Sequence, residues 1–407
     1  MFLDRFLWFC VILILFGQSI LQDYSIVSNI ALLIISIRQT FKLKLKEQSY
    51  LVAFLIWIAL LFFYSILRGN EISLAFRFCL VILFVLYSYL WKVDSQFFFK
   101  CITWISGILV LCLIGLEIFM FTLSFDEYQA FRDGVINLNK MGDVFWYGIY
   151  YKLELLGTPL IVFVYMLSYV ISIFPSRFEK ILRIFYLTGV ILAGNFAYQL
   201  ALVVFHLIFY VYDTIRNKHN RLRRLVFLLI ISLSLGGALF IYISNELKAK
   251  SDFSTATRKD FVGVLYNDMS EDCISLLFGT GMGHTINVKT SYRDYRGNTY
   301  FEIQSMYIFN QLGLINFTML ILLNILLAFW FIKDKRLMMI YGIYVLYAST
   351  NPYIWDTNHI VVIVSLLCGK LQIKQHGDLY QCKVPVLKRS LIRNGQFNSS
   401  NNNPLSS

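Results

Sequence analysis

The sequence predicts an all-α integral membrane protein with about twelve transmembrane helices and one large polar loop on the outer face. Three observations lead to this fold class. Hydrophobic residues make up 58% of the 407-residue chain and charged residues only 15%, whereas soluble domains carry about 25% charged residues. Apolar stretches close to the roughly 20 residues that cross a bilayer recur from end to end. Basic residues gather in alternate connections between these stretches.

The apolar stretches predict a single transmembrane domain over residues 1–373, followed by a cytoplasmic tail over 374–407. The tail is basic and then polar, ending NSSNNNPLSS, which is typical of a disordered segment. The expected spans, in chain order, are 6–22, 24–37, 49–67, 74–91, 101–123, 155–174, 184–195, 197–212, 225–244, 304–332, 337–350 and 358–373.

The segment 184–212 is too long for one crossing and barely long enough for two. Basic clusters flank it on both sides, and basic flanks are typical of cytoplasmic connections. We therefore expect two short helices, or a re-entrant pair, with a turn near Gly194 and Asn195. The alternative is one long tilted helix, which would invert the orientation of everything that follows.

The distribution of Lys and Arg predicts the orientation. Of the 36 basic residues, 24 lie at Arg5, from Lys370 onward, and in the connections 38–48, 92–100, 175–183, 213–224 and 333–336. The positive-inside rule places these segments, and both termini, in the cytoplasm. The net charge of +12 is then a signal of membrane topology, and it does not indicate a nucleic-acid partner. The bilayer itself is the expected partner.

Two loops of appreciable size remain outside, at about 124–154 and 245–301. The second is the large polar loop, and it holds Arg258, the run Phe-Gly-Thr-Gly-Met-Gly-His over 278–284, and Arg293 and Arg296. Alternate glycines at Gly279, Gly281 and Gly283 let the backbone turn sharply, and turned N–H groups can hold a phosphate. The alternative interpretation of this run is a tight turn at the membrane surface.

The ionisable residues of the large loop suggest a site that binds a phosphate pair and abstracts a proton. Arg258 offers the bidentate fork that suits a diphosphate, and Arg293 and Arg296 could instead bind anionic headgroups. Glu302 stands where the loop re-enters the membrane, and partial removal from water makes a carboxylate a better base. His284 is the second candidate base.

A shorter outer turn could complete the site. Tyr353 could stack on a sugar, and His359 follows it closely enough to face the same cavity. No set of side chains on the outer face has the spacing of metal ligands, so the sequence predicts neither a metal nor a cofactor.

These residues resemble a known family. Arg258, then FGTGMGH, then EIQSMYIFNQLGLI at 302–315 and later Thr-Asn-Pro-Tyr at 350–353 are similar to the Wzy-type O-antigen polymerases and the related O-antigen ligases of Gram-negative inner membranes. Many members carry a histidine where this chain has Glu302, and a Ser-Arg pair where it has Gly194 and Asn195. These differences favour a polymerase over a ligase.

The resemblance implies a metal-independent glycosyltransferase of GT-C-like architecture in lipopolysaccharide biosynthesis. Its donor would be an oligosaccharide on undecaprenyl diphosphate, transferred at the periplasmic face of the bacterial inner membrane onto the next lipid-linked repeat unit. Glu302 or His284 would act as the base, while Arg258, Arg293, Arg296, the three glycines, Tyr353 and His359 would bind substrate. The implied partners are a chain-length regulator and a flippase of the same pathway. The alternatives are an O-antigen ligase and a polysaccharide flippase or transporter.

Overall fold

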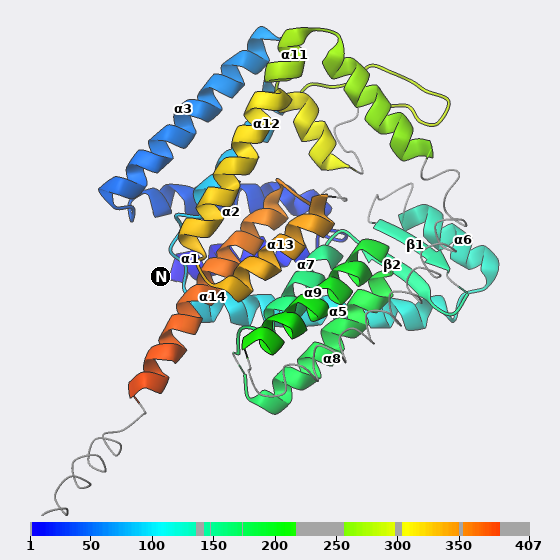
Figure 1. Ribbon diagram of the computed structural model, residues 1–407. Coiled ribbons are helices and arrows are strands. Elements are labelled where there is room, and N and C mark those ends of the chain that lie inside the picture. The colour runs from blue at the N-terminus through cyan, green and yellow to red at the C-terminus, as the bar shows by residue number, and fades with distance from the viewer. Residues whose placement is uncertain are drawn as a thin grey trace, which may run out of the picture.

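The protein is mostly helical (Figure 1). The computed structural model describes residues 2–135, 142–146, 148–172, 174–216, 256–297, 303–349 and 353–382. In chain order its elements are α1 (Phe2–Phe16), η1 (Gln22–Tyr24), α2 (Ser25–Thr40), α3 (Leu45–Leu67), α4 (Ile72–Ser88), α5 (Ser95–Met120), α6 (Phe125–Asp133), β1 (Gly142–Trp146), β2 (Tyr151–Leu155), α7 (Thr158–Leu167), α8 (Ser176–Ala193), α9 (Phe196–Arg216), the helical residues 256–270, α11 (Cys273–Phe278), α12 (Gln304–Phe331), α13 (Lys335–Ser349) and α14 (Thr357–Cys382).

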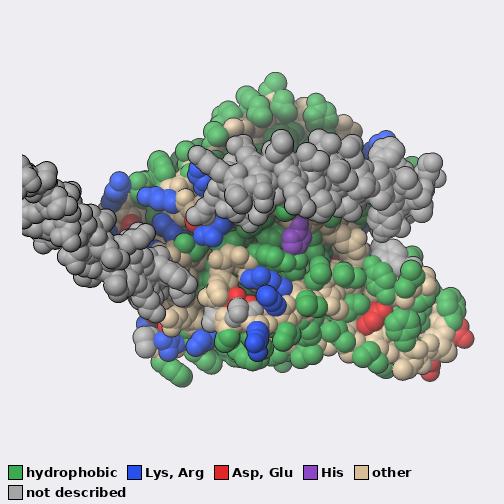
Figure 2. Space-filling view, turned by 60° about the horizontal axis from the view of Figure 1, so that its bottom comes forward, with side chains coloured by type: hydrophobic (Ala, Val, Ile, Leu, Met, Phe, Trp, Pro, Cys, Tyr) green, Lys and Arg blue, Asp and Glu red, His purple; other side chains and the backbone are tan. Residues whose placement is uncertain are grey.

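Three of the described helices, α3, α5 and α12, are long and apolar enough to cross a membrane. Their apolar surface is largely uncovered: in α3, Ile56, Leu60 and Phe63 are 58%, 63% and 63% exposed. Soluble proteins rarely expose contiguous apolar surface of this kind, because water disfavours it. Figure 2 shows hydrophobic side chains over much of the visible face. The fold is therefore that of a membrane protein.

Eleven of the twelve expected spans coincide with helices, and the other, 225–244, lies outside the described residues. The number of helices that cross the bilayer stays a prediction, because several of these helices are shorter than a full crossing needs. At the C-terminal end, α14 continues to Cys382, past the expected end at residue 373. The rest of the tail, 383–407, lies outside the described residues.

Residues 184–212 form two helices, as predicted, and the turn lies at Gly194 and Asn195. Gly194 ends α8 in the left-handed conformation, with φ of 60°, which glycine adopts without strain. The Asn195 side chain then accepts a hydrogen bond from the N–H of Ala197 (2.9 Å), as a residue before a helix commonly does. One continuous helix is therefore excluded for this segment.

The expected outer loop 124–154 contains α6 and a two-stranded antiparallel sheet, in which Val144 pairs with Leu153. This hairpin makes the fold mostly helical rather than all-α. It contacts the turn between α8 and α9, because the amide of Asn195 hydrogen-bonds the carboxylate of Glu154. The α8–α9 turn and this loop consequently lie on the same side of the molecule.

Ion pairs join three of the basic segments at one end of the helices. Arg5 contacts Asp94 (2.6 Å), Arg38 contacts Asp4 (2.6 Å) and Lys92 contacts Glu47 (3.0 Å). These pairs bring the N-terminus and the connections 38–48 and 92–100 together. The connection 67–72, at the far end of α3, instead contacts the large loop, through Arg68 and Asp272 (3.1 Å). The large loop therefore lies at the end of α3 opposite these basic connections.

Which of these two ends faces the cytoplasm can be tested by labelling. We expect a cysteine at Lys46, in the basic connection, to be protected from a membrane-impermeant maleimide in intact spheroplasts. A cysteine at Tyr292, which is 46% exposed in the large loop, should react. The parent is a cysteine-free variant, and lysed cells provide the control for reactivity. Reaction of both positions from the outside would contradict the predicted topology.

A buried polar cluster links four helical segments inside the protein. The Tyr89 hydroxyl donates to Asn324 Oδ1 (2.8 Å), the Asn324 amide donates to the Tyr341 oxygen (2.6 Å), and the Tyr341 hydroxyl lies 2.9 Å from His359 Nε2. All four residues are at most 5% exposed. We call these residues the tyrosine–histidine cluster. It connects the end of α4 to α12, α13 and α14.

Candidate catalytic site

The described part of the large loop, 256–297, folds around its own small core. Helical residues 256–270 pack against a hairpin-like segment, 286–297, and against the start of α12. The buried side chains of this core are Phe261, Leu265, Ile286, Tyr295 and Tyr307. Asp260 also ties helix to hairpin, because its carboxylate accepts hydrogen bonds from Thr290 (2.7 Å) and Tyr295 (3.0 Å). The polar composition of the loop did not predict this core.

The three glycines of 278–284 lie where this loop packs closely against other segments of the chain. A Cβ at Gly279 would lie 2.1 Å from the carbonyl oxygen of Gln311, and one at Gly283 would lie 2.5 Å from the amide nitrogen of Ala75. All three glycines also have positive φ, between 79° and 92°. Only glycine therefore fits at these positions.

The amide groups of this glycine run already have protein partners. The N–H groups of Thr280 and Gly281 donate to the carbonyls of Asn310 and Gln311 (3.0 Å each). The N–H of Met282 donates to the Ser65 hydroxyl (2.7 Å), and that of Gly283 to the Gln311 side chain (3.3 Å). The expected phosphate-binding role of Gly279, Gly281 and Gly283 is therefore not supported. The run is closer to the alternative interpretation of a tight turn, and it packs against other segments of the protein. We call residues 279–283 the glycine joint.

A break in α12 receives this joint. Gly313 has a φ of 67° and a ψ of −179° inside the helix, a conformation that essentially only glycine adopts. A Cβ there would lie 2.2 Å from the nitrogen of Gly279. Two glycine backbones thus pass one another at contact distance, and the helix interruption makes room for the loop.

His284, at the end of the joint, pairs with a carboxylate. Its Nε2 lies 3.1 Å from Asp268 Oδ2, although the two residues are 16 positions apart. The Asn310 side-chain amide donates to the same carboxylate (2.8 Å), and its Oδ1 accepts from the Thr280 hydroxyl (3.0 Å). The side chains of His284 and Asp268 are 26% and 20% exposed, so the pair is sheltered but remains accessible.

The environment keeps Asp268 ionised. Burial would by itself raise the pKa of this carboxyl, but hydrogen bonds from His284 and Asn310 outweigh that effect and lower the pKa below its usual value. An ionised carboxylate at Nε2 favours the tautomer with a proton on that nitrogen, which leaves Nδ1 as the proton acceptor. The pair thus has the arrangement of a base oriented by an acid residue.

Arg68 connects this site to the end of α3. It contacts both Asp272 (3.1 Å) and the Ser275 hydroxyl (2.5 Å). Hydrogen bonds from Ser275 and then from Arg68 lower the pKa of Asp272 to about 2. Sequence reasoning singled out neither Asp268 nor Arg68, because a charged residue in a polar loop or at a helix end is most simply solvated.

The expected arginines lie away from the histidine pair. Arg258 and Asp268 are carried by the same helical residues, 256–270, and ten residues of helix correspond to roughly 15 Å along the axis. Arg293 and Arg296 are exposed on the hairpin that Asp260 anchors, and Arg296 Nε donates to Asp294 Oδ1 (2.9 Å). The structure therefore separates the proposed base His284 from the proposed diphosphate ligands.

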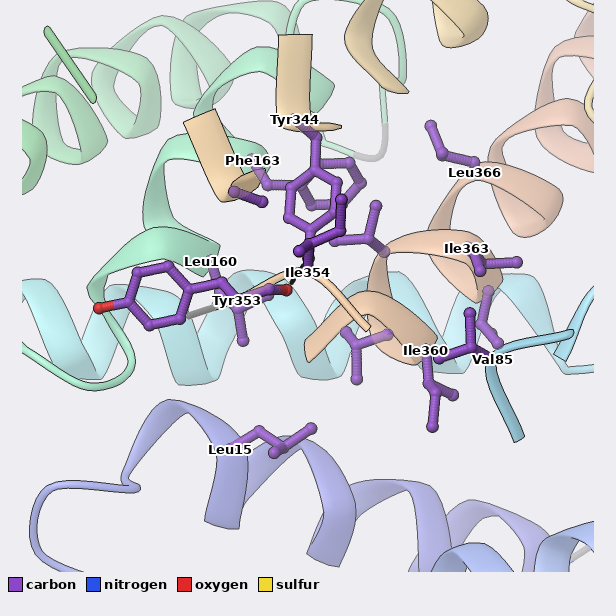
Figure 3. Close-up of a cluster of buried hydrophobic side chains, with 14 of the residues drawn as sticks. Leu15, Val85, Leu160, Phe163, Tyr344, Tyr353, Ile354, Ile360, Ile363 and Leu366 are labelled. Carbon is purple, nitrogen blue, oxygen red and sulfur yellow. Dashed lines mark hydrogen bonds between the residues drawn. The ribbon is translucent and has the colours of Figure 1, made fainter. Parts of the chain in front are cut away.

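Tyr353 and His359 do not face an outer cavity. His359 is fully buried, at 0% exposure, and belongs to the tyrosine–histidine cluster. Tyr353 is 7% exposed, and its carbonyl accepts from the Tyr344 hydroxyl (2.7 Å), as Figure 3 shows. The apolar side chains around this contact in Figure 3 include Leu160, Phe163, Ile354 and Ile360. Both residues therefore have structural surroundings, contrary to the expectation from sequence.

The structure does not place one of the expected site residues. Glu302 lies outside the described residues, so its role as the base stays a prediction. Among the residues that the structure describes, no group of three or more His, Cys, Asp and Glu side chains could hold a metal ion.

Comparison with protein-family models, curated proteins and solved structures finds no match to this chain.

Proposed function

We propose that this protein is a membrane glycosyltransferase that polymerises lipid-linked oligosaccharides of the O-antigen type. The observation that carries the proposal is the pair of His284 and Asp268, which lies in the large loop beside the ends of the apolar helices α3 and α12. A base held there by a carboxylate could act on a sugar whose lipid anchor remains in the bilayer.

The proposed reaction transfers a glycan from undecaprenyl diphosphate to a sugar hydroxyl of the next lipid-linked repeat unit. The acceptor oxygen forms a bond to the anomeric carbon of the donor as the bond from that carbon to the diphosphate oxygen breaks. The diphosphate leaves with the bonding electrons. His284 Nδ1 takes the hydroxyl proton, and the Asp268 carboxylate stabilises the resulting imidazolium.

Cationic groups would bind the diphosphates of the donor and acceptor lipids. Arg258 is exposed and carries the bidentate guanidinium, but it is roughly 15 Å from Asp268 along the helix axis. The departing diphosphate is bonded to the carbon that the activated hydroxyl attacks, so the ligand of Arg258 would be the diphosphate of the acceptor lipid. Arg68 is the cation closer to the base, through its contact with Ser275.

The experiment that tests this function uses purified protein in liposomes with a synthetic oligosaccharide on undecaprenyl diphosphate. We expect a ladder of products of increasing length. A ligase would instead require a lipid A core acceptor, and a flippase would move the lipid across the bilayer without forming product. If stable, monodisperse protein does not extend the lipid-linked substrate, the proposal is overturned.

Arg258→Lys tests the diphosphate contact. Lysine keeps the positive charge but loses the bidentate fork, so we expect a loss of at least about tenfold in polymerisation with unchanged membrane insertion. The matched control is Lys259→Ala, which removes the exposed neighbouring charge and should have little effect. Normal product from Arg258→Lys would remove this residue from the site and leave Arg293 or Arg296 as candidates.

A further inference from the structure

The short helix α11 has one uncovered apolar face. Ile274, Leu277 and Phe278 are 56%, 39% and 44% exposed, and their spacing places them on the same side of a helix. Ser275 is 1% exposed and bonds to Arg68 (2.5 Å). The helix thus holds its polar contacts against the protein and turns its apolar side chains outward.

This helix lies against the C-terminal end of α3 and against the break in α12 at Gly313, and both membrane-spanning candidates reach it at the top of Figure 1. The carbonyl of Phe278 accepts from the amide of Asn316 in α12 (3.2 Å). Asn316 in turn accepts from Trp57 of α3 (3.5 Å). Trp57 is ten residues before Leu67, which corresponds to roughly 15 Å of helix. Through Asn316, the C-terminal end of α11 is thus linked to a residue of α3 that lies well away from the end of that helix.

The glycine joint that follows α11 also lies below the end of α3. The Tyr64 hydroxyl donates to the carbonyl of Gly279 (2.7 Å), and the Ser65 hydroxyl accepts from the amide of Met282 (2.7 Å). On the other side the joint touches Ala75, one turn inside α4. Residues 279–283 therefore lie between α3 and α4, and the chain leaves this position at His284.

Lipid-facing surface continues around this element. In α3, Phe63 and Leu67 are 63% and 86% exposed. In α12, an apolar face begins directly after Gly313, and Leu314, Leu322 and Leu326 on it are 50%, 54% and 46% exposed. The apolar face of α11 is an extension of the surface that α3 and α12 present to lipid.

We propose that α11 and the glycine joint form a re-entrant element whose partner is the bilayer itself, with Ile274, Leu277 and Phe278 inserted among the acyl chains at this end of α3. Non-helical backbone is tolerated at membrane depth only where its polar groups are satisfied by protein. The N–H groups of residues 280–283 meet that condition, and so do the carbonyls of Gly279, Thr280 and Gly281. This inference does not depend on the proposed reaction. It places His284 at the level of the lipid headgroups.

Spin labels measure the depth directly. In a cysteine-free variant, in which all seven cysteines are replaced, a nitroxide is attached at Ile274, Leu277 or Phe278 in phosphatidylethanolamine–phosphatidylglycerol vesicles. We expect collision rates severalfold higher with oxygen, which partitions into lipid, than with a water-soluble nickel chelate. Leu60, on the middle of α3, is the lipid-exposed control, and Tyr292, on the hairpin, is the water-exposed control.

Two results would overturn the proposal. Labels on α11 that behave like the one at Tyr292 would place this face in water. Labels accessible to neither reagent would show that another protein surface covers it. A second measurement retains the native cysteines, so it does not depend on the cysteine-free variant folding. A photoreactive amino acid at Leu277 should form adducts with phospholipid, whereas the same group at Tyr292 should not. None of these measurements requires polymerase activity.

Discussion

Substitution of His284 by glutamine is expected to lower the rate of polymerisation by about 10²- to 10⁴-fold, the usual loss when a general base is removed. Glutamine retains a polar side chain that can donate a hydrogen bond to Asp268, so the contact between His284 and Asp268 is replaced by a similar one. The amide has no basic nitrogen, however, and it cannot take the proton of the attacking hydroxyl. In cells, single repeat units should accumulate on the lipid carrier while long chains disappear.

Asp268→Asn separates orientation from proton transfer. The amide can still accept from His284, but it no longer carries the negative charge that stabilises an imidazolium, so we expect a loss of rate that is smaller than that of His284→Gln. Thr290→Ala, which removes a hydrogen bond elsewhere in the loop, serves as the structural control.

The same assay decides between the two candidate bases. Glu302→Gln is nearly unchanged in shape, and if Glu302 is the base it should abolish long polymer as completely as the histidine substitution does. Full-length chains from His284→Gln, together with an inactive Glu302→Gln, would transfer the role to the glutamate.

Gly313→Ala is expected to cause the largest loss of stability of any substitution considered for this protein. The backbone conformation at Gly313 costs a residue with a side chain about 1–3 kcal/mol. The added Cβ would also lie 2.2 Å from the nitrogen of Gly279, so either the helix break or the joint must move. Both movements would break the hydrogen bonds from residues 280 and 281 to Asn310 and Gln311.

Stability can be followed as the fraction of monodisperse protein that survives heating in detergent. The matched control is Gly263→Ala, because Gly263 lies in helical residues 256–270 with no atom within 4 Å of its added Cβ. Alanine stabilises a helix interior by about 1 kcal/mol over glycine, so the control should survive heating at least as well as the parent. A Gly313→Ala protein as stable as the parent would show that the close contact with Gly279 relaxes freely.

Hydrophobic periodicity and charge were sufficient to predict the helices. Helices coincide with eleven of the expected spans, and the turn lies at Gly194, because each depends on local features of the sequence, namely an apolar stretch and a residue able to break a helix. The interior of the large loop depends instead on contacts between distant residues. The pairing of His284 with Asp268, and of Gly279 with Gly313, arises only when the loop, α3 and α12 are brought together.

The dependence on contacts between distant residues also explains why the expected roles of Tyr353, His359 and the three glycines were wrong. His359 and Tyr353 follow a short polar turn, which suggested an outer cavity, yet they pack inward against α13. The alternate glycines suggested a phosphate loop because the pattern reports only that the backbone turns sharply. It does not report whether a ligand or another protein segment occupies the inside of the turn.

The tyrosine–histidine cluster has a consequence for how the helices assemble in the bilayer. Apolar side chains provide little driving force for helices to associate in a bilayer, since lipid and the neighbouring helix are equally apolar. Tyr89 lies 235 positions before Asn324, whereas Asn324, Tyr341 and His359 come from the successive helices α12, α13 and α14, and each of the four satisfies a polar group of another. If α13 or α14 shifted by one turn, these polar groups would lose their hydrogen-bond partners inside the bilayer. The cluster thus sets the register in which the inserted helices dock, which apolar packing alone would leave loosely defined.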